Sequence, residues 1–514
     1  MLTLVDRGYY IEADGNELER LRHYLTVEVK DAYFARKHRP GWDGTVKFMT
    51  EHGLFSVGLI GHVLAWLERQ GIRYAYRPAD SALRSVTVSN GVLNGITLTK
   101  DQLESVMCWF LARGRGLLWA CPGFGKTEAA AACIATLYRN SLLHGKTLML
   151  VNGLDLLAQG RDRLALRLGI KVGSVAGGVW DTDPLVVVGS ISQLYTVAKN
   201  PKHPMFSQLK QFLSRVEFLI TDECHHGRAR SYRKLSSLCR AGAHYRLGLS
   251  ASPFHNYHEN DLQRMTAEDV MVMETMGQVV YRTTASDQIE AGRLAAMRVY
   301  LVPYDSPDDR SLWQQAYKYH VYRNPALHDQ IAQVVKAAAD AGEMSLVVAG
   351  ASRDEYGATI SEALKKRGVN VYFLHGKVDK EIRESVRQAA NEGKVQAIVA
   401  TTIYDEGVDL PDLRLLIMAG GLSSIKIHQR TGRNLRRKSH GENTAVLVDF
   451  VSYGNKHLRK HSRARIKLYG AEPQYDIRLV GGLAAHPHVR GLLPKFTSVA
   501  EPPTVEDFKQ LAEG

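Results

Sequence analysis

The stretch that most restricts the fold of this chain is Ala120–Thr127, which reads Ala-Cys-Pro-Gly-Phe-Gly-Lys-Thr. It fits the pattern A/G-x-x-x-x-G-K-T of a phosphate-binding loop, in which glycines let successive backbone N–H groups point at phosphate oxygens. The apolar residues before it predict a short buried strand, and the alanine-rich segment 128–138 after it predicts a helix. This order predicts an α/β fold with an anion at the N-terminus of the helix.

Individual residues of this loop suggest separate tasks. Lys126 supplies a positive charge for the β- and γ-phosphates of a nucleotide, and the hydroxyl of Thr127 is an oxygen ligand for Mg²⁺. A glycine-rich turn with a chance Lys-Thr pair is the alternative, and the motifs that follow argue against it. The residues whose backbone would surround the phosphates are Pro122, Gly123, Phe124 and Gly125.

Two adjacent carboxylates follow an apolar run in Phe218–His225, which reads Phe-Leu-Ile-Thr-Asp-Glu-Cys-His. At a strand end, Asp222 is placed to hold Mg²⁺ and Glu223 to polarise the water that attacks the γ-phosphate. Alone, such a pair is explained equally well by a solvated turn. Together with a phosphate-binding loop it predicts a centre that hydrolyses ATP, with His225 as a coupling residue.

A third motif is the arginine-rich stretch Gln429–Arg437. A solvated basic face or a nucleic-acid patch would explain its composition. Arginines from a second domain can also stabilise the charge that develops on a γ-phosphate during hydrolysis. Arg433 and Arg436 are the candidates, because residues three apart share one face of a helix.

Apolar strand-like segments alternate with helical segments in two parts of the chain. Strand, crossover and strand imply a parallel sheet covered by helices. In the first part we predict strands at Leu117, Thr147–Val151, Leu185–Val188, Phe218–Thr221 and Tyr245–Leu249. In the second part we predict strands at Ser345–Ala349, Val369–Leu374, Ala397–Ala400, Leu413–Met418 and Thr444–Val448.

The order of these motifs resembles that of superfamily 2 helicases over residues 96–453. Residues 120–127 resemble motif I, 222–225 a DECH form of motif II, and 250–252 motif III, with Ser252 where the family usually has Thr. Cys224 likewise replaces the usual Ala. The more weakly matching segments are 148–159 (motif Ia), 188–193 (Ib), 346–350 (IV), 401–409 (V) and 429–436 (VI).

This resemblance implies two tandem RecA-like domains, with ATP and Mg²⁺ in the cleft between them and nucleic acid across both. It implies that Gln102 reads adenine and that Gly407 and Asp409 contact the nucleotide. It adds Gln429 to Arg433 and Arg436 in the hydrolytic centre. The nucleic-acid contacts that it implies within the motifs are Ser190, Gln193 and Thr401.

The first 95 residues predict a separate small α+β domain, with a strand at Thr45–Met49 and an amphipathic helix at Leu59–Gln70. Trp42, in a basic and turn-rich segment, is either an ordinary core residue or part of a nucleic-acid platform. The basic residues of that platform are Arg36, Lys37, Arg39 and Lys47. This domain and the segment Gly277–Leu294 resemble those of the phage UvsW-type helicases, within the XPB-like branch.

After Tyr453 the chain carries a basic run, Asn455–Leu468, without an acidic residue. It predicts either a solvated basic helix or a helix that contacts duplex DNA. Its predicted contacts are Lys456, Arg459, Lys460 and Arg463, and the run also includes Arg465 and Lys467. The last thirty residues hold several prolines and predict a loosely ordered end.

We therefore predict an α/β protein of two tandem RecA-like parallel-sheet domains, a small N-terminal α+β domain and a basic C-terminal extension. The predicted bounds are 1–95 for the N-terminal domain, 96–275 for the ATP-binding domain, 276–300 for the linker, 301–453 for the second RecA-like domain and 454–514 for the extension.

The composition is that of a globular protein with several domains, with 45% hydrophobic and 23% charged residues among 514. A net charge of +13 predicts a polyanionic partner. Five cysteines without metal-ligand spacing or a secretory signal predict a reducing compartment, and the resemblance implies the cytoplasm of a bacterial or phage-infected cell. No apolar run is long enough to predict a membrane span.

Together these features predict an ATP-dependent DNA helicase or translocase. The resemblance implies that it unwinds or branch-migrates forked and four-way DNA in recombination, repair or replication restart, and that it acts on single strands and RNA–DNA hybrids. The alternatives are an RNA helicase, an R-loop-unwinding enzyme and the translocase subunit of a restriction system. A DNA-binding scaffold with an inactive ATPase would require the loss of Lys126, Glu223 or Arg433, and all three are present.

Overall fold

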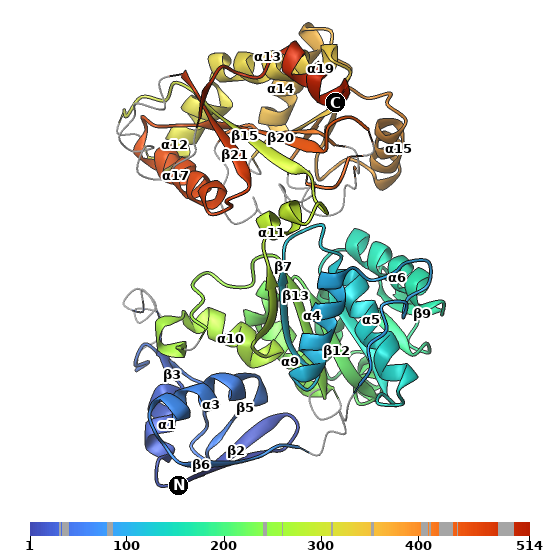
Figure 1. Ribbon diagram of the computed structural model, residues 1–514, viewed down its shortest axis with the longest axis vertical. Coiled ribbons are helices and arrows are strands. Elements are labelled where there is room, and N and C mark those ends of the chain that lie inside the picture. Colours follow the sequence, from blue (N-terminus) through green and yellow to red (C-terminus); the bar gives the residue numbers. More distant parts are fainter. Residues whose placement is uncertain are drawn as a thin grey trace. The chain divides into compact units, whose positions relative to one another are not determined.

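The computed structural model describes most of the chain, in two compact units that we treat one at a time (Figure 1). The first comprises residues 1–120 and 124–282, and the second 121–123 and 283–514. The described residues are 1–29, 32, 41–79, 86–239, 244–259, 261–309, 312–350, 354–401, 410, 413–420, 435–438, 440–481 and 498–513.

The first unit is built on an eight-stranded sheet with the order β10-β9-β11-β8-β12-β13-β7-β14. The six strands from β9 to β7 in this order are parallel to their neighbours, and β10 is antiparallel to β9. The predicted strands of this part are confirmed, and β9, β10 and β14 are additional. The bounds are β7 Arg115–Ala120, β8 Lys146–Val151, β9 Val172–Ala176, β10 Val179–Trp180, β11 Val186–Ser190, β12 Val216–Asp222, β13 Tyr245–Ser250 and β14 Val279–Thr283.

Helices pack on this sheet because its strands are apolar on both faces. Leu148 and Leu150 of β8 contact a cluster that includes Leu194, Leu209 and Leu235 from three different helices. Along the chain these are α7 Ile191–Ala198, α8 Phe206–Leu213 and α9 Arg230–Leu238, followed by α10 Ala267–Met276. A second packed group consists of α4 Lys100–Leu111, α5 Lys126–Arg139 and α6 Leu154–Leu168.

The N-terminal part has a four-stranded sheet with the order β5-β2-β1-β6 and a separate hairpin of β3 and β4. Its elements are β1 Leu2–Asp6, β2 Tyr10–Gly15, α1 Leu18–Tyr24, β3 Thr26–Glu28, β4 Thr45–Lys47, β5 Leu54–Ser56, α3 Ile60–Arg69 and β6 Tyr74–Arg77. Its core continues into the first RecA-like domain, because Leu262, Val270 and Met273 pack in the same apolar cluster.

Polar contacts also fix the N-terminal part to this domain. Asp6 pairs with Arg115 at the start of β7, with 3.2 Å between Oδ2 and Nη1. The guanidinium of Arg246, buried in β13, lies 5.0 Å from the ring centroid of Tyr9. The side-chain amide of Gln263 donates to three backbone carbonyls, those of residues 23, 24 and 26. The first unit therefore holds its N-terminal part as one packed body.

The second unit has an eight-stranded sheet with the order β17-β18-β16-β19-β20-β15-β21-β22, in which every neighbouring pair is parallel. The predicted strands of this part are confirmed, and β15, β21 and β22 are additional. The bounds are β15 Ala296–Pro303, β16 Ser345–Val348, β17 Val371–Leu374, β18 Ala397–Ala400, β19 Leu415–Met418, β20 Thr444–Val451, β21 Tyr475–Val480 and β22 Ser498–Ala500.

The described residues after Tyr453 are part of this second fold. β21 and β22 extend the sheet beside β15, and the last helix buries Phe508 and Leu511 against the core. The prediction of a loosely ordered end is wrong for residues 505–513, because two apolar side chains three positions apart give that helix a face to bury. The helices of the unit are α11 Ala285–Glu290, α12 Trp313–Tyr317, α13 Pro325–Asp340, α14 Asp354–Lys366, α15 Lys380–Asn391, α17 Lys456–Gly470 and α19 Val505–Glu513.

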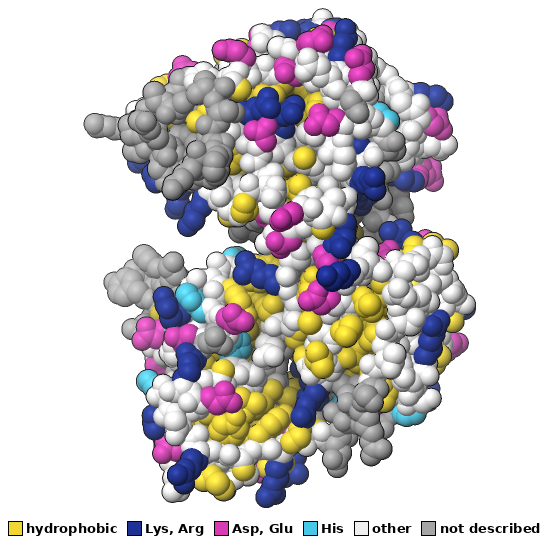
Figure 2. All heavy atoms as spheres, in the orientation of Figure 1, with side chains coloured by type: hydrophobic (Ala, Val, Ile, Leu, Met, Phe, Trp, Pro, Cys, Tyr) yellow, Lys and Arg dark blue, Asp and Glu magenta, His cyan; other side chains and the backbone are white. Residues whose placement is uncertain are grey.

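The basic helix α17 divides its cations between core and surface. Arg465 is fully buried and forms a two-pronged pair with Asp449 of β20, with Nε–Oδ2 and Nη2–Oδ1 distances of 2.8 and 3.0 Å. It is therefore not available to a polyanion, unlike the other members of the run. The cations that remain exposed are Lys456, Lys460, Arg463 and Lys467; dark-blue side chains lie over α17 in Figure 2.

Replacing Asp449 with alanine is expected to destabilise the second unit by about 3–5 kcal/mol, because Arg465 would be left as an unpaired buried charge. Urea unfolding followed by circular dichroism would measure the loss. Glu392→Ala, which removes an exposed pair with Lys394, is the control and is expected to leave the unfolding midpoint unchanged. Equal midpoints for the two variants would contradict a structural role for the buried pair.

Candidate functional site

The phosphate-binding loop joins the carboxyl end of β7 to the start of α5. Gly123 and Gly125 have φ angles of 84° and 87°, a region that side chains disfavour. A Cβ on Gly125 would also lie 2.3 Å from the side-chain nitrogen of Gln102. Lys126 is the first residue of α5, and its amine donates to the carbonyl of Ala120 at 3.0 Å. The loop geometry thus depends on glycine at both positions.

Gln102 connects this loop to the start of α4. Its side-chain oxygen accepts from the backbone N–H of Thr99 at 3.0 Å, and its amide nitrogen donates to the carbonyl of Phe124 at 2.8 Å. The ring of Phe124 is buried and lies 5.9 Å from that of Tyr281. These contacts give Gln102 a role in shaping the loop that the motif did not suggest, and the adenine contact stays a prediction.

A charged contact beside the loop was not foreseen from the sequence. Glu128, in the first turn of α5, is buried and accepts from Arg163 of α6 at 2.5 Å. The Nε of Arg167 lies 3.8 Å from the same carboxylate. Because α6 contains the second half of the segment that resembles motif Ia, this pair connects that segment with the phosphate-binding loop.

The carboxylates lie at the same edge of the sheet as the loop, because β12, β13 and β7 are adjacent parallel strands. Asp222 ends β12, and its Oδ1 accepts from the backbone N–H of Glu223 at 3.0 Å. Glu223 has a φ of 47°, which is unusual for a residue with a side chain.

The two acids differ in proton affinity. Burial and the neighbouring charge of Glu223 raise the pKa of Asp222, against an opposing effect of Lys126. Burial also acts to raise the pKa of Glu223, but the hydrogen bond from His225 and the charge of Lys126 outweigh it and lower the pKa. Glu223 is therefore the acid that these contacts keep ionised, as an acceptor for a water proton must be.

Ser250 is the last residue of β13. Its hydroxyl makes polar contacts both with the acidic motif and with the loop that follows β13. Its hydroxyl lies 3.3 Å from Nδ1 of His225 and 3.5 Å from Oε2 of Glu223. It also accepts from the backbone N–H of Ser252 at 3.2 Å. Glu223 and His225 are themselves 3.3 Å apart. Ser250 therefore contacts Glu223 and His225 of the acidic motif as well as the backbone of Ser252, and coupling between them stays a prediction.

The donor set beside the loop fits Mg²⁺. Thr127 and Asp222 offer a hydroxyl and a carboxylate, the oxygen ligands that this ion uses together with substrate phosphates. The raised pKa of Asp222 indicates that its charge lacks sufficient stabilisation from the protein alone. Within the part of the chain that the structure describes, no three His, Cys, Asp or Glu side chains form a metal-binding group.

Two predicted nucleic-acid contacts of the first unit line one cavity of about 490 Å³. Ser190 ends β11, and Gln193 lies in the first turn of α7. Asn152 and Leu154, from the segment that resembles motif Ia, and Trp180 of β10 line the same cavity. The two motif segments are therefore neighbours in space, whereas their contacts with nucleic acid stay predictions.

The predicted N-terminal platform is described only in part. Trp42 is half-buried, and its indole N–H donates to the carbonyl of Thr45 at 2.8 Å. Lys47 is exposed, with its amine 3.9 Å from Asp43. Arg36, Lys37 and Arg39 lie outside the described residues.

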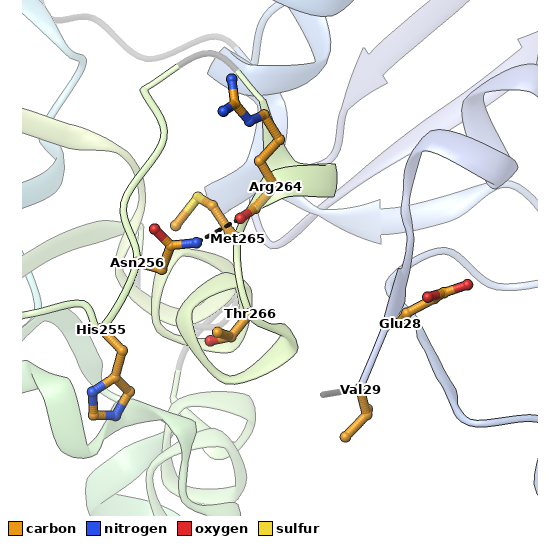
Figure 3. A pocket seen from close by; sticks show the side chains of 7 residues that line it. All are labelled: Glu28, Val29, His255, Asn256, Arg264, Met265 and Thr266. Atoms are coloured by element: carbon orange, nitrogen blue, oxygen red, sulfur yellow. Dashed lines mark hydrogen bonds between the residues drawn. The ribbon is translucent and has the colours of Figure 1, made fainter. Parts of the chain in front are cut away.

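A cavity of about 590 Å³ lies in the first unit, between the N-terminal part and the loop after residue 252. Figure 3 shows Glu28 and Val29 on one side and His255 and Asn256 on another, with Asn256 donating to the carbonyl of Arg264 at 2.8 Å. The side chains of His255 and Asn256 both have polar partners in the protein, and we assign this cavity no ligand.

Less of the predicted site in the second unit is described. Thr401 is buried at the end of β18, and the backbone of Arg436 forms an isolated bridge with Leu294. The remaining predicted residues here, Gly407, Asp409, Gln429 and Arg433, lie outside the described residues. On α17, Lys456, Lys460 and Arg463 are exposed, and Arg459 donates to the carbonyls of residues 453 and 454.

None of the helices in the described ranges is long and apolar enough to cross a membrane. All five cysteines are free thiols. Burial raises the pKa of Cys224, beside the acidic pair, well above its ordinary value. This thiol is therefore held in its neutral form.

Two family models match the chain, one in each unit. "Type III restriction enzyme, res subunit" matches residues 95–255, which contain the phosphate-binding loop and the acidic pair. "Helicase conserved C-terminal domain" matches residues 329–438, which contain the arginine-rich motif. The two matches are in the order that the sequence motifs predict.

Two curated proteins and one solved structure are similar to most of the chain. The DNA 3'-5' translocase XPB2 of Sulfurisphaera tokodaii is 26% identical over 405 residues, covering 72% of this chain and 85% of that protein. The ATP-dependent DNA helicase uvsW of Enterobacteria phage T4 is 23% identical over 466 residues, covering 85% and 87%. The solved structure of S. cerevisiae Dbp5 bound to RNA and ADP BeF3 shares the fold, with a TM-score of 0.51 and 12% identity over 74% of this chain and 89% of that one. The chain thus belongs to the superfamily 2 helicases, ATP-dependent motor enzymes.

Proposed function

We propose that this enzyme is a DNA helicase or translocase that remodels forked and four-way DNA. The observation that carries the proposal is the meeting of Lys126, Glu223 and Ser250 at the carboxyl edge of one parallel sheet. DNA as the substrate is supported by the names of the relatives XPB2 and uvsW, a DNA translocase and a DNA helicase.

In this proposal Glu223 polarises a water for attack on the γ-phosphate of ATP. The bond between the γ-phosphorus and the β–γ bridging oxygen breaks, and ADP and phosphate leave. Lys126 stabilises the charge that moves onto the bridging oxygen. From the second domain, Gln429, Arg433 and Arg436 complete the hydrolytic centre, and Gly407 and Asp409 contact the nucleotide.

The residues that would hold Mg²⁺ are Thr127 and Asp222. When bound, the ion neutralises charge on the β- and γ-phosphates. The protein's own contribution is to fix Thr127 in the first turn of helix α5 and Asp222 at the end of strand β12. Gln102 would read adenine from the start of α4.

We assign DNA to two sets of contacts. A tracked strand lies against Ser190, Gln193 and Thr401, and duplex arms lie against the N-terminal platform and α17. The residues for the arms are Arg36, Lys37, Arg39, Trp42, Lys47, Lys456, Arg459, Lys460 and Arg463. The net charge of +13 supports an affinity for phosphates that falls as salt rises. We place this work in recombination, repair or replication restart, in the cytoplasm of a bacterial or phage-infected cell.

The translocase of a restriction system is the second candidate. It is favoured by the family model over residues 95–255, whose description names a restriction enzyme subunit. Such an enzyme would need a nuclease or methylase partner and would show no preference for branched DNA. An RNA helicase has less support, because the likeness to Dbp5 at 12% identity concerns the fold alone.

Stimulation of ATP hydrolysis by different nucleic acids tests the proposal. We expect turnover to rise most with forks and four-way junctions, less with single strands or linear duplex, and least with RNA. Phosphate release would be measured with each nucleic acid at the same concentration, counted in nucleotides. An RNA–DNA hybrid is included as a further substrate, and the Lys126→Ala enzyme is the blank. Equal stimulation of ATP hydrolysis by linear duplex and by junctions would favour the restriction translocase. Stimulation by RNA alone would contradict DNA as the substrate.

A further inference from the structure

Trp313 is a surface aromatic residue that the proposed hydrolysis does not use. Its side chain is 51% exposed, and the preceding Leu312 is 72% exposed. The indole stands edge-on to the ring of Tyr317, with centroids 5.1 Å apart and an interplanar angle of 89°. Because Tyr317 is buried, it holds the indole from one side and leaves about half of Trp313 open to solvent.

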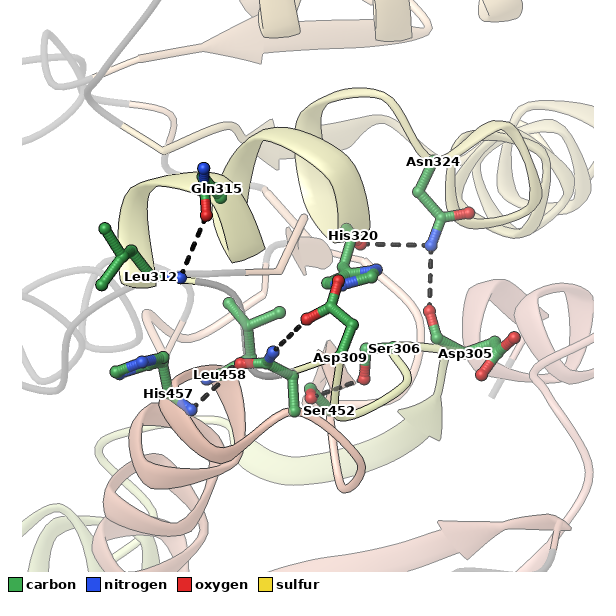
Figure 4. A network of polar contacts seen from close by, with 11 residues as sticks. Asp305, Ser306, Asp309, Leu312, Gln315, His320, Asn324, Ser452, His457 and Leu458 are labelled. Atoms are coloured by element: carbon green, nitrogen blue, oxygen red, sulfur yellow. Dashed lines mark hydrogen bonds and ion pairs between the residues drawn. The ribbon is translucent and has the colours of Figure 1, made fainter.

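A polar network fixes this segment beside α17 (Figure 4). Asn455, the N-cap of α17, donates to Asp309 at 3.5 Å, and Asp309 lies 2.9 Å from Nε2 of His320. Further along, the hydroxyl of Tyr317 lies 2.9 Å from Nδ1 of His461. One of these contacts is at Asn455, the N-cap of α17, and the other is at His461, in its second turn. Together they place α12 along the first two turns of α17.

The exposed face of α17 is a cationic stripe, which we define as Lys456, Lys460, Arg463 and Lys467. Their spacing of three or four residues puts them on one face of the helix. α17 contains no acidic residue, and the buried Arg465 is neutralised by Asp449. The stripe is therefore free of carboxylates within its own helix.

We propose that Trp313 and the cationic stripe form one binding site for a single strand of nucleic acid. Trp313 stacks on an unpaired base, and the stripe contacts the neighbouring phosphates. Single-strand sites combine a positive track with aromatic rings, because every base offers a face to stack on. The site rests on the proposed function and refines it: α17 contacts the phosphates of a strand where it leaves a duplex arm, and the first unpaired base of that strand is held by Trp313.

Fluorescence anisotropy with labelled oligothymidylate and an abasic strand of equal length separates stacking from charge. We expect Trp313→Ala to raise the Kd for oligothymidylate about 5- to 150-fold and to leave the Kd for the abasic strand unchanged. Trp313→Phe should restore most of the affinity. Lys460→Ala should weaken the binding of both strands. It should also lower the slope of the salt dependence by about 0.7 log unit, because one phosphate is no longer neutralised.

Tyr319→Ala is the matched control, because this ring in the same segment is 52% exposed and faces the amine of Lys318 at 5.5 Å. It is expected to bind both strands like the wild-type enzyme. Thermal unfolding would confirm that each variant is folded. If the wild-type enzyme binds DNA and Trp313→Ala binds oligothymidylate equally well, the stacking site is wrong and the motor proposal stands. A wild-type enzyme that binds neither strand overturns both.

Discussion

Replacing Glu223 with glutamine is expected to reduce ATP hydrolysis about 10²- to 10⁴-fold, the usual contribution of a general base. The amide keeps the shape of the side chain and its contact distance to Ser250 but cannot accept a proton from the attacking water. ATP should still bind, because Lys126 and the loop backbone are unchanged. Phosphate release and equilibrium binding of a fluorescent ATP analogue would measure the two effects separately.

Two further variants make this result specific. Lys126→Ala is expected to abolish hydrolysis and also to weaken ATP binding, because it removes the charge that faces the phosphates. Cys224→Ala changes the buried neighbour of Glu223 to the residue that the helicase family usually has there, and it should keep most of the turnover. Undiminished hydrolysis in a verified Glu223→Gln preparation would contradict the assignment of Glu223.

The central strands of both sheets could be predicted from the sequence because parallel strands are buried on both faces. Such strands are continuous apolar runs, as Thr147–Val151 and Ala397–Ala400 are, and both match their strands closely. The phosphate-binding loop was predictable for another reason. Its chemistry depends on neighbouring residues in the chain, so its spacing is visible in one sequence.

Contacts between residues that are far apart in the sequence have no spacing pattern from which they could be predicted. The pairs Asp6–Arg115 and Asp449–Arg465 each join separate elements, and neither has a spacing that one sequence reveals. The bonds of Gln102 to the phosphate-binding loop, and of Ser250 to the acidic motif, depend in the same way on the packing of the sheet. Motif order therefore predicts residues of a site but not the contacts that hold them in place.

The strand β15 was missed for a different reason. Residues 296–303 are mostly apolar and buried between β20 and β21, but the preceding segment resembles an interdomain linker. The linker assignment, 276–300, therefore covered the first half of a central strand. The N-terminal part likewise has its own apolar pattern, and only the structure shows that its core includes Met273 of α10.

Arg433→Ala is expected to lower the turnover of ATP by about 10³-fold while leaving the affinity for ATP nearly unchanged. The physical reason is that an arginine which neutralises charge on the γ-phosphate matters most in the transition state, where that charge is redistributed. Single-turnover hydrolysis of bound ATP and equilibrium nucleotide binding would be measured side by side. Arg433→Lys keeps the charge but loses the planar fork of donors, so it should recover only part of the rate.

Arg436 gives this experiment an internal comparison. Its backbone is bridged to Leu294 at the approach to β15, a contact that does not depend on the arginine side chain. Because the backbone makes this bridge, Arg436→Ala should keep it, so Arg436→Ala and Arg433→Ala are both expected to lower turnover without reducing the thermal stability of the second unit. Arg433→Ala could instead greatly weaken ATP binding while the ATP that does bind is hydrolysed at the normal rate. In that case Arg433 acts in ground-state binding, and its transition-state role is wrong.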